Sequence, residues 1–248
     1  MMKIIITTAK NKTNIMLFGI LFSVFSILCA GTIYVSTLRT LDVSIDNFNY
    51  KTVIIDAGHG GVDGGTSAAD GTLEKDINLQ IALKLDKMLN AMGVKTILIR
   101  DSDISIHNES AKTIRQKKVS DLKNRLNIIS NTDDPIFVSI HQNHFGESKY
   151  KGTQVFYSKN NPLSSNLAEK IRMPVISYLQ KDNTREIKQS GSDIFLLYHS
   201  QAPSVMIECG FLSNPEETEN LKNENYQQKL SFLIAIGIMD YFNNTEEL

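Results

Sequence analysis

Four residues of this chain have side chains and positions suited to hydrolytic chemistry. His59 and His141 end the apolar runs VIIDAGH and IFVSIH, and Glu208 ends a third run, VMIE. Glu74 opens a helical pattern that follows the first glycine-rich stretch. In α/β sheets, functional side chains gather at the carboxyl ends of strands. These four residues can therefore meet although they lie far apart in the sequence.

Two neutral imidazoles and one carboxylate are a common ligand set for catalytic zinc, which keeps a fourth position for water. His59, Glu74 and His141 would supply that set. A metal held in this way lowers the pKa of its water toward ~7 and polarises a carbonyl oxygen, as hydrolysis of an unactivated amide requires. Glu208 would remain as the general base that takes the proton of the water and passes it to the leaving nitrogen.

Each of these residues has a simpler explanation when it is considered alone. A single histidine at a strand end is more often a hydrogen-bonded structural residue, and a carboxylate in the first helical turn is favoured by the helix dipole. The glycine-rich stretch DAGHGG is not a phosphate-binding loop, because it lacks both a suitable lysine and the GxGxxG spacing. The combination of four residues, and no single one, favours a hydrolytic site.

Two further residues compete for roles in this site. Cys209 could be a nucleophile paired with His141 in a hydrolase without metal. Neighbours on a strand point to opposite faces, so Cys209 should face the core if Glu208 faces the site. His144 closely follows His141 and is a rival metal ligand, although a surface histidine beyond the strand is the simpler interpretation.

Two residues are expected to contact a substrate. Arg185 follows a predicted helix and could clamp a carboxylate with two parallel hydrogen bonds, although an arginine exposed to solvent is an equally good interpretation. Asn143 lies two positions beyond His141 and is the second candidate. The glycines of the stretch that follows the first run are better explained by tight turns around a metal than by binding of their own.

The hydrophobic pattern predicts the α/β sheet that these residues need. Apolar runs typical of strands occupy residues 51–56, 94–100, 135–141, 152–158, 194–198 and 204–209. Helical periods alternate with them at residues 74–92, 118–131, 163–181 and 226–242. We therefore expect a single domain with a central, mostly parallel or mixed sheet of about six strands, covered by helices on both faces.

The amino-terminal part of the chain has a different composition. Residues 14–38 contain no charge and follow three lysines, and about 20 apolar residues suffice to span a bilayer. The lysines place everything after this segment outside the cytoplasm. The segment is a membrane anchor or a cleaved signal peptide, and its length favours the anchor. We expect a basic N-terminus, this hydrophobic segment, a connector, a catalytic domain and a tail, at residues 1–13, 14–38, 39–50, 51–243 and 244–248.

Charge and cysteine content exclude other classes of protein. The net charge of -1 and the lack of a long basic block argue against nucleic-acid binding. Of the two cysteines, one lies in the hydrophobic segment, so the exported domain has only Cys209 and no internal disulfide. Its stability must come from its core.

Four stretches, VIIDAGHGGVDGGT, EKDINL, SIHQN and PSVMIECGFLSNPEE, resemble in order the motifs of the zinc-dependent N-acetylmuramoyl-L-alanine amidases called amidase type 3. The resemblance runs from about residue 52 to 242. It implies cleavage of the amide between N-acetylmuramic acid and L-alanine of the peptidoglycan stem peptide. It also implies one zinc ion held by His59, Glu74 and His141, with Glu208 as the catalytic glutamate.

The short layout is similar to that of the germination-specific amidases of spore formers, which implies action on spore cortex and formation of muramic δ-lactam. A vegetative cell-wall amidase and a peptidoglycan-binding module without catalysis are the alternatives. Some relatives carry a helix that plugs the metal site, but residues 146–203 offer no spare helix, so we expect an open site. Restraint would then come from expression timing, incomplete zinc loading or a separate exported protein that stabilises the zinc-loaded form.

Overall fold

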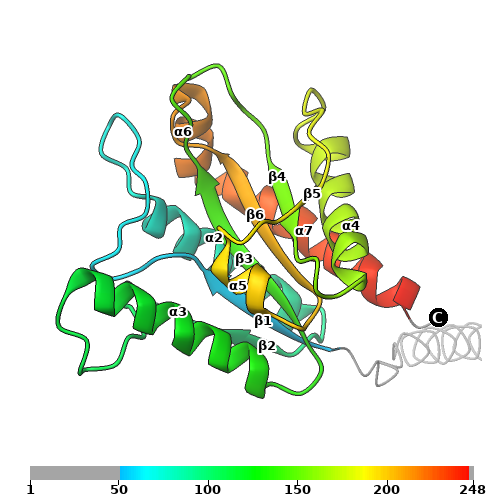
Figure 1. Ribbon diagram of the computed structural model, residues 1–248. Helices are drawn as coiled ribbons and strands as arrows, with labels where there is room; N and C mark the ends of the chain where they lie inside the picture. Colours follow the sequence, from blue (N-terminus) through cyan, green and yellow to red (C-terminus); the bar gives the residue numbers. More distant parts are fainter. Residues whose placement is uncertain (1–50, 246–248) are drawn as a thin grey trace, which may run out of the picture. The chain divides into compact units, whose positions relative to one another are not determined.

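The computed structural model describes residues 51–245, and a six-stranded sheet forms its centre (Figure 1). The strands are β1 (Thr52–Ala57), β2 (Thr96–Leu98), β3 (Pro135–Asn143), β4 (Gln154–Tyr157), β5 (Lys188–Gln189) and β6 (Ser204–Phe211). They lie in the order β2-β1-β3-β6-β4-β5. All neighbours are parallel except β4 and β6, which are antiparallel. The predicted mixed sheet of six strands is confirmed.

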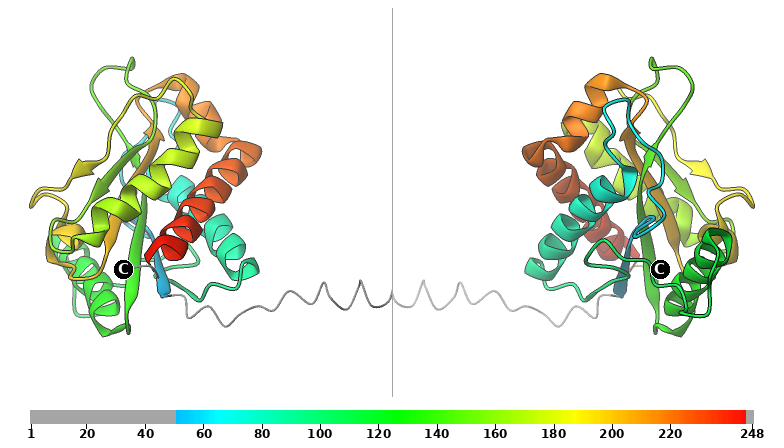
Figure 2. Two further views of the ribbon diagram at one scale, coloured as in Figure 1. Left: turned by 90° about the vertical axis from the view of Figure 1, so that its right-hand side faces the viewer. Right: turned by 90° about the vertical axis from the view of Figure 1, so that its left-hand side faces the viewer.

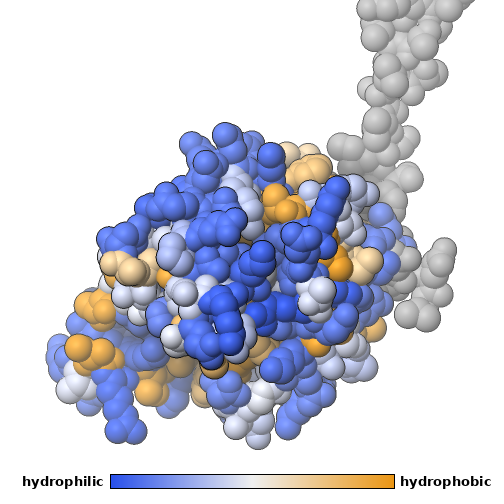
Figure 3. All heavy atoms as spheres, turned by 90° about the horizontal axis from the view of Figure 1, so that it is seen from above, coloured by the Kyte–Doolittle hydropathy of each residue, from blue (hydrophilic) through white to orange (hydrophobic). Residues whose placement is uncertain are grey.

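Helices cover both faces of the sheet, as predicted (Figures 1 and 2). They are α2 (Glu74–Ala91), α3 (Ile114–Asn131), α4 (Leu163–Tyr178), α5 (Phe195–His199), α6 (Pro215–Lys222) and α7 (Glu224–Thr245). Helices α2, α4 and α7 pack over one face and bury the larger apolar core, while α3 and α5 pack over the other and bury a smaller one. The surface seen from above is mainly hydrophilic (Figure 3).

The face of the sheet that carries α3 and α5 changes from apolar to polar along its strands. In β3, Phe137 lies in the smaller core, and Ser139 and His141 follow at alternate positions on the same face. In β6, Met206 belongs to the smaller core and Glu208 is the next residue on that face. The carboxyl ends of the parallel strands therefore present polar side chains next to one another.

One predicted strand is wrong. Residues 194–198 were expected to form a strand, but Phe195–His199 form helix α5, in which Leu196 and Leu197 are buried in the smaller core. A short apolar run does not distinguish a strand from one or two helical turns. The fifth strand of the sheet is instead Lys188–Gln189, and because both residues are exposed it has no hydrophobic pattern.

Two helices that begin at side-chain caps differ from the prediction. Helix α3 begins earlier than predicted, at a capping box: the Thr113 side chain accepts a hydrogen bond from the Gln116 backbone, and the Gln116 side chain accepts one from the Thr113 backbone. Helix α6 was not predicted. The Asn214 side chain caps it, and Pro215 occupies its first turn, where proline is favoured.

The hydrophobic segment 14–38 lies outside the described residues, as do the basic N-terminus and the connector that were predicted around it. Within residues 51–245, no helix combines the length and the apolar character needed to cross a membrane. Residues 51–245 belong to one compact unit.

Gly237 on α7 provides a test of the packing between α4 and α7. A Cβ atom at this position would lie 2.5 Å from the Ile171 Cα atom and 2.5 Å from the Lys170 carbonyl oxygen. Because backbone atoms cannot move aside cheaply, we expect Gly237→Ala to lower the free energy of unfolding by roughly 1–3 kcal/mol. That cost exceeds the gain of about 1 kcal/mol in helix propensity.

Urea unfolding followed by circular dichroism measures this effect. Gly146→Ala is the matched control, because a Cβ atom there meets nothing within 4 Å. Its free energy of unfolding should stay within about 0.5 kcal/mol of the wild-type value. Equal stability of the two variants would contradict the close helix contact.

Candidate functional site

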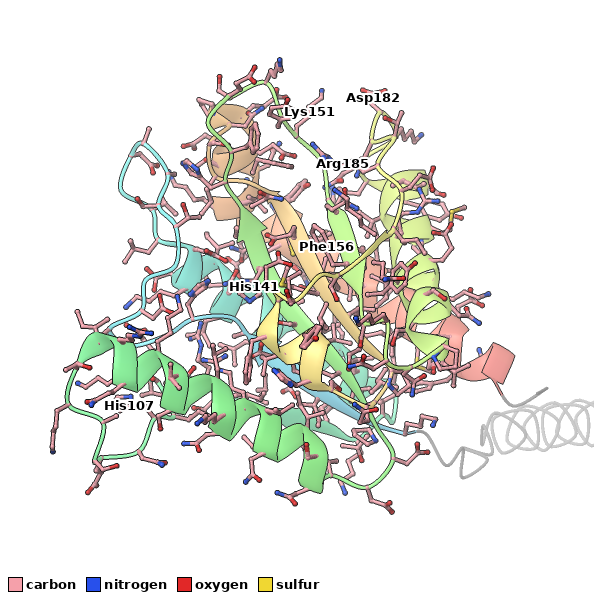
Figure 4. The ribbon with its side chains drawn as sticks, in the orientation of Figure 1. His107, His141, Lys151, Phe156, Asp182 and Arg185 are labelled. Atoms are coloured by element: carbon pink, nitrogen blue, oxygen red, sulfur yellow. The ribbon has the colours of Figure 1, made fainter. Side chains whose placement is uncertain are left out.

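The structure brings His59, Glu74 and His141 together. One potential ligand atom from each residue lies within 4.8 Å of the others. His141 Nδ1 is 2.9 Å from Glu74 Oε1, and His59 Nε2 is 3.3 Å from Glu74 Oε2. His59 lies in the loop after β1, Glu74 in the first turn of α2 and His141 on β3, where Figure 4 shows it.

Glycines make room for the ligands in the loop after β1. His59 itself has a left-handed backbone with φ 64°, and Gly60, Gly61 and Gly65 also have positive φ. A Cβ atom at Gly65 would lie 2.4 Å from Glu74 Oε2 and 2.8 Å from His59 Cδ2. The loop thus wraps so closely around the carboxylate that a side chain would not fit, in agreement with the predicted tight turns.

Glu74 is a buried carboxylate with several donors around it. Its oxygens accept hydrogen bonds from the backbone N–H groups of Thr66 at 2.9 Å and Gln142 at 3.1 Å, and from the Asn78 side chain at 3.4 Å. Burial by itself would raise the pKa of Glu74, but hydrogen bonds with His141 and His59 hold that pKa well below its usual range. The carboxylate is therefore ionised and ready to bind a cation.

His59 is oriented by an acidic residue that the sequence analysis missed. Its Nδ1 atom lies 3.0 Å from Asp63 Oδ2, and Lys118 Nζ lies 3.2 Å from the same carboxylate. Burial opposes protonation of His59, yet Asp63 and Glu74 raise its pKa to about 9. Histidine ligands of metals commonly donate their second nitrogen to a carboxylate, which leaves Nε2 facing Glu74. An acidic residue four positions after a candidate ligand was the available clue.

The three residues fit a small divalent cation. Two imidazole nitrogens and one carboxylate lie within 4.8 Å of one another, and such a set is common in catalytic zinc sites, which keep a fourth position for water. A cavity of about 60 Å³ adjoins both histidines, with Leu196 on its wall. Since a water molecule occupies about 30 Å³ in the liquid, this cavity has room for one or two of them.

Glu208 lies beside this cluster on the neighbouring strand. It pairs with His141 in the register of β3 and β6, so both side chains project from the same face. Its Oε2 atom is buried and has no hydrogen-bond partner within residues 51–245. Burial raises the pKa of Glu208 to about 7, although the charge of His141 opposes this rise. A carboxylate with a free, desolvated oxygen is suited to accept a proton.

The two competing residues point elsewhere. Cys209 is fully buried in the larger core, on the face opposite Glu208, as the strand alternation predicted. Burial raises the pKa of its thiol above the ordinary value, which makes a thiolate nucleophile unfavourable. His144 follows the end of β3, is exposed, and does not belong to the ligand cluster in the described part of the chain.

The two predicted substrate-contact residues do not join the metal cluster. Asn143 is the last residue of β3 and pairs with Phe211 at the end of β6. The guanidinium carbon of Arg185 lies 4.6 Å from the centre of the Phe211 ring, and its Nε atom donates to the Lys151 carbonyl oxygen at 2.9 Å. Figure 4 shows Arg185 and Lys151 near the top of the molecule. Both predicted residues therefore lie near Phe211, farther along the sheet than the histidines.

Helix α5 lies in the interval where no additional helix was expected. Its side chains Leu196 and Leu197 pack into the smaller core, so α5 is part of the fold and does not fill the ligand cluster. The side chain of His141 remains 20% exposed and that of His59 17%. Both imidazoles therefore remain partly exposed, and the open site stays a prediction.

Comparison with known proteins gives consistent matches. Residues 53–240 match the family described as N-acetylmuramoyl-L-alanine amidase. The germination-specific N-acetylmuramoyl-L-alanine amidase of Bacillus subtilis is 32% identical over 196 residues, which cover 77% of this chain and 80% of that protein.

Two solved structures resemble the fold and the sequence. The CwlD amidase from Clostridioides difficile, in complex with the GerS lipoprotein, is 47% identical with a TM-score of 0.76, covering 79% of this chain and 100% of that chain. The catalytic domain of the amidase CwlV from Bacillus (Paenibacillus) polymyxa is 28% identical with a TM-score of 0.64, covering 78% of this chain and 99% of that chain.

A substitution at Gly58 tests the cluster without changing any of the three proposed ligands. A Cβ atom at Gly58 would lie 2.2 Å from His141 Nε2, so Gly58→Ala must rotate the imidazole away from Glu74. Because outer groups that orient a ligand typically change metal affinity 10- to 100-fold, we expect a loss of about that size. Calorimetric titration of the metal-free protein with Zn²⁺ measures it.

Gly64→Ala is the matched control for this experiment. A Cβ atom at Gly64 would make only ordinary contacts, the nearest at 3.6 Å from a methyl group of Leu73. This variant should bind Zn²⁺ like the wild type. Unchanged affinity in Gly58→Ala would show that His141 does not need its present orientation.

Proposed function

Because this chain belongs to the N-acetylmuramoyl-L-alanine amidase family, it is a peptidoglycan amidase, and we propose that it works with one zinc ion on spore cortex. The proposed reaction cleaves the amide between N-acetylmuramic acid and L-alanine of the stem peptide. One observation carries the proposal: a candidate ligand set of two histidines and a glutamate lies beside a carboxylate with an unpartnered oxygen.

The proposed ligands are His59 through Nε2, Glu74 through its carboxylate and His141 through Nδ1, the atoms that face one another. A bound zinc ion supplies Lewis acidity toward the amide carbonyl and lowers the pKa of water. Asp63 places its negative charge 3.0 Å from His59 Nδ1, and the donors around Glu74 hold its carboxylate in place.

Glu208 is the proposed general base. Its free Oε2 atom accepts the proton of the attacking water, and the protonated carboxyl then gives a proton to the departing nitrogen of L-alanine. The C–N bond breaks, leaving a lactyl carboxylate and a free amino group. A module that only binds peptidoglycan gains nothing from a buried carboxylate without a partner, which costs stability. This cost favours the enzyme over the binding module.

The proposed spore role rests on relatives. A relative named germination-specific and the similarity to CwlD favour cortex peptidoglycan over vegetative wall, which remains the alternative substrate. The predicted order of basic N-terminus 1–13, hydrophobic segment 14–38 and connector 39–50 would place catalytic domain 51–243 outside the cytoplasm. We propose that the protein acts there, anchored or secreted, in the wall or cortex compartment.

We also propose a partner for this amidase. The related CwlD amidase is found in complex with a lipoprotein, which supports a separate exported protein for this chain. The His141 side chain is partly exposed and α5 packs into the smaller core, which supports restraint by a partner alongside expression timing and incomplete zinc loading. A partner that binds only the zinc-loaded form would raise the apparent zinc affinity by linkage.

Incubation of the full chain with zinc and purified peptidoglycan tests the main proposal. Mass spectrometry should detect free peptides that begin with L-alanine, together with glycan that has lost its peptides. Removal of the metal with a chelator should abolish release, and added zinc should restore it. Release of disaccharide fragments with intact stem peptides would show a different hydrolase.

Glu208→Gln separates metal binding from catalysis. The amide has the shape of the carboxylate but cannot accept the proton, so we expect kcat to fall at least 100-fold, the lower range for general acid–base catalysis. Zinc content should remain at the wild-type level, since Glu208 is outside the ligand set. Elemental analysis and peptide release measure the two effects.

Cys209→Ser is the control on the same strand. The side chain of Cys209 faces the opposite core, so turnover should remain near the wild-type value, while burial of a hydroxyl lowers stability. Normal turnover of Glu208→Gln would remove Glu208 from the mechanism. Loss of turnover in folded, zinc-loaded Cys209→Ser would instead support the cysteine hydrolase.

Arg185 and Asn143 are the proposed substrate contacts. A cavity of about 510 Å³ lies beside Arg185, with Lys151 and Lys181 among its lining residues. Arg185 sits over Phe211, three residues beyond Glu208 on β6, which corresponds to about 10 Å along a strand. The carboxylates of a stem peptide extend over this range.

We therefore expect Arg185→Ala to raise KM for peptidoglycan peptides about tenfold and to leave kcat nearly unchanged, because a distant contact binds substrate and transition state equally. Steady-state kinetics with soluble muropeptides measures the two constants. Arg115→Ala, on α3, is a control that should change neither. A fall in kcat with constant KM would assign Arg185 a role in the chemical step.

A further inference from the structure

Two buried arginines hold the backbone of the loop that carries His59. Arg100 donates from Nε to the Ala57 carbonyl oxygen at 2.8 Å and from Nη2 to the Gly58 carbonyl oxygen at 3.1 Å. Arg125 donates from Nη1 to the Ala57 carbonyl oxygen at 3.0 Å and from Nη2 to the His59 carbonyl oxygen at 2.7 Å. Three successive carbonyl groups of the loop are therefore held by guanidinium donors.

These hydrogen bonds hold the part of the loop in which the backbone conformation is unfavourable. His59 has φ 64°, a left-handed conformation that residues with a Cβ atom rarely adopt. Such conformations persist only where the surroundings determine them, and they are common at functional sites. The hydrogen bond from Arg125 ends on the carbonyl group of His59 itself. Without this bond, His59 would be free to relax toward an ordinary backbone and carry its imidazole away from Glu74.

Hydrogen bonds to Asp56 and Asp121 also fix the Arg125 guanidinium. Its Nη1 atom bonds the Asp56 carboxylate and its Nε atom donates to Asp121 at 2.6 Å, while Ser139 donates to the second oxygen of Asp56 at 2.6 Å. The side chains of Arg125 and Asp56 are 2% and 1% exposed. A buried ion pair seldom stabilises a fold more than apolar residues of the same size would. Its geometric role therefore explains its presence better.

We propose that Arg125 is a positioning residue for the metal, which holds His59 in its left-handed conformation and thereby sets the affinity of the site. This inference rests on the proposed role of His59 as a ligand. Arg125 is not one of the clustered ligands; it lines the small cavity beside the histidines and acts on the ligand through the His59 backbone. Asp56 and Asp121 fix the guanidinium in the direction of that carbonyl group.

Arg125→Lys tests the proposal in the full chain. A lysine keeps a positive charge beside Asp56 and Asp121, but its single ammonium group cannot replace the planar fork that reaches the loop as well. We expect Zn²⁺ affinity to fall about 10- to 100-fold, as for other groups that orient a metal ligand. Calorimetric titration of the metal-free protein gives the affinity, and thermal unfolding of the same sample shows that it is folded.

Asp56→Asn/Arg125→Gln keeps the proposal testable if the lysine variant does not fold. Removing both charges together leaves neither Asp56 nor residue 125 as an unpaired ion, and Asp121, which loses its ion pair with Arg125, keeps hydrogen bonds from Ser105 and the Ile106 backbone. The shorter glutamine side chain no longer reaches the His59 carbonyl group. The same loss of Zn²⁺ affinity is expected. Arg172→Lys is the control, because the Arg172 side chain is also largely buried and forms ion pairs with Glu169 and Glu186, on α4 and the segment after it, although these two carboxylates are exposed. It should lose thermal stability and keep its Zn²⁺ affinity.

Wild-type Zn²⁺ affinity in either folded variant of Arg125 would overturn the proposal, because the arginine would then contribute only to stability. An equal loss of affinity in Arg172→Lys would overturn it too, since any buried charge would then matter. His59→Ala distinguishes the inference from the proposed function. Full Zn²⁺ affinity in that variant would overturn the metal site itself, whereas lost affinity there with normal binding in the Arg125 variants would overturn only the inference.

Discussion

The site depends on one buried anion. Glu74 contacts both histidines, and a carboxylate removed from water has to be surrounded by donors or cations. Its remaining partners are backbone and amide groups from the loop after β1, from β3 and from its own helix. Satisfying this single charge therefore joins three segments that are distant in the sequence. A cation that binds there would replace the imidazole hydrogen bonds with stronger contacts and leave the surrounding donors unchanged.

The sequence predicted the parts of the fold that have a periodic pattern. Strands with continuous apolar runs were found in place because burial on both faces requires such runs. The errors occurred where the pattern was short or absent, at α5, whose four apolar residues fit one helical turn as well, and at β5, whose residues are exposed. Helix α6 could have been found from its Asn-Pro cap, but it has few apolar residues.

The candidate site, like the fold, could be predicted from the sequence only in part. His59, Glu74, His141 and Glu208 could be chosen because three of them end apolar runs of the sequence and Glu74 begins a helix, and the structure places them side by side. The residues that hold them could not be chosen in this way. Arg125 resembles any other charged residue of an exposed helix, since the tertiary fold alone brings its guanidinium to the carbonyl group of His59. Sequence patterns show which atoms can react, whereas the supports of those atoms become visible only in three dimensions.

The two edge strands of the sheet influence whether copies of the protein associate with one another. Strand β2 has three residues and β5 has two, one of them a lysine, so each edge exposes only a few unpaired N–H and C=O groups. Long, flat edges invite strand addition and aggregation, and short or charged edges prevent them. The protein therefore has little tendency to polymerise through its sheet. It can remain dispersed, and contacts with other proteins are directed to its helices and loops.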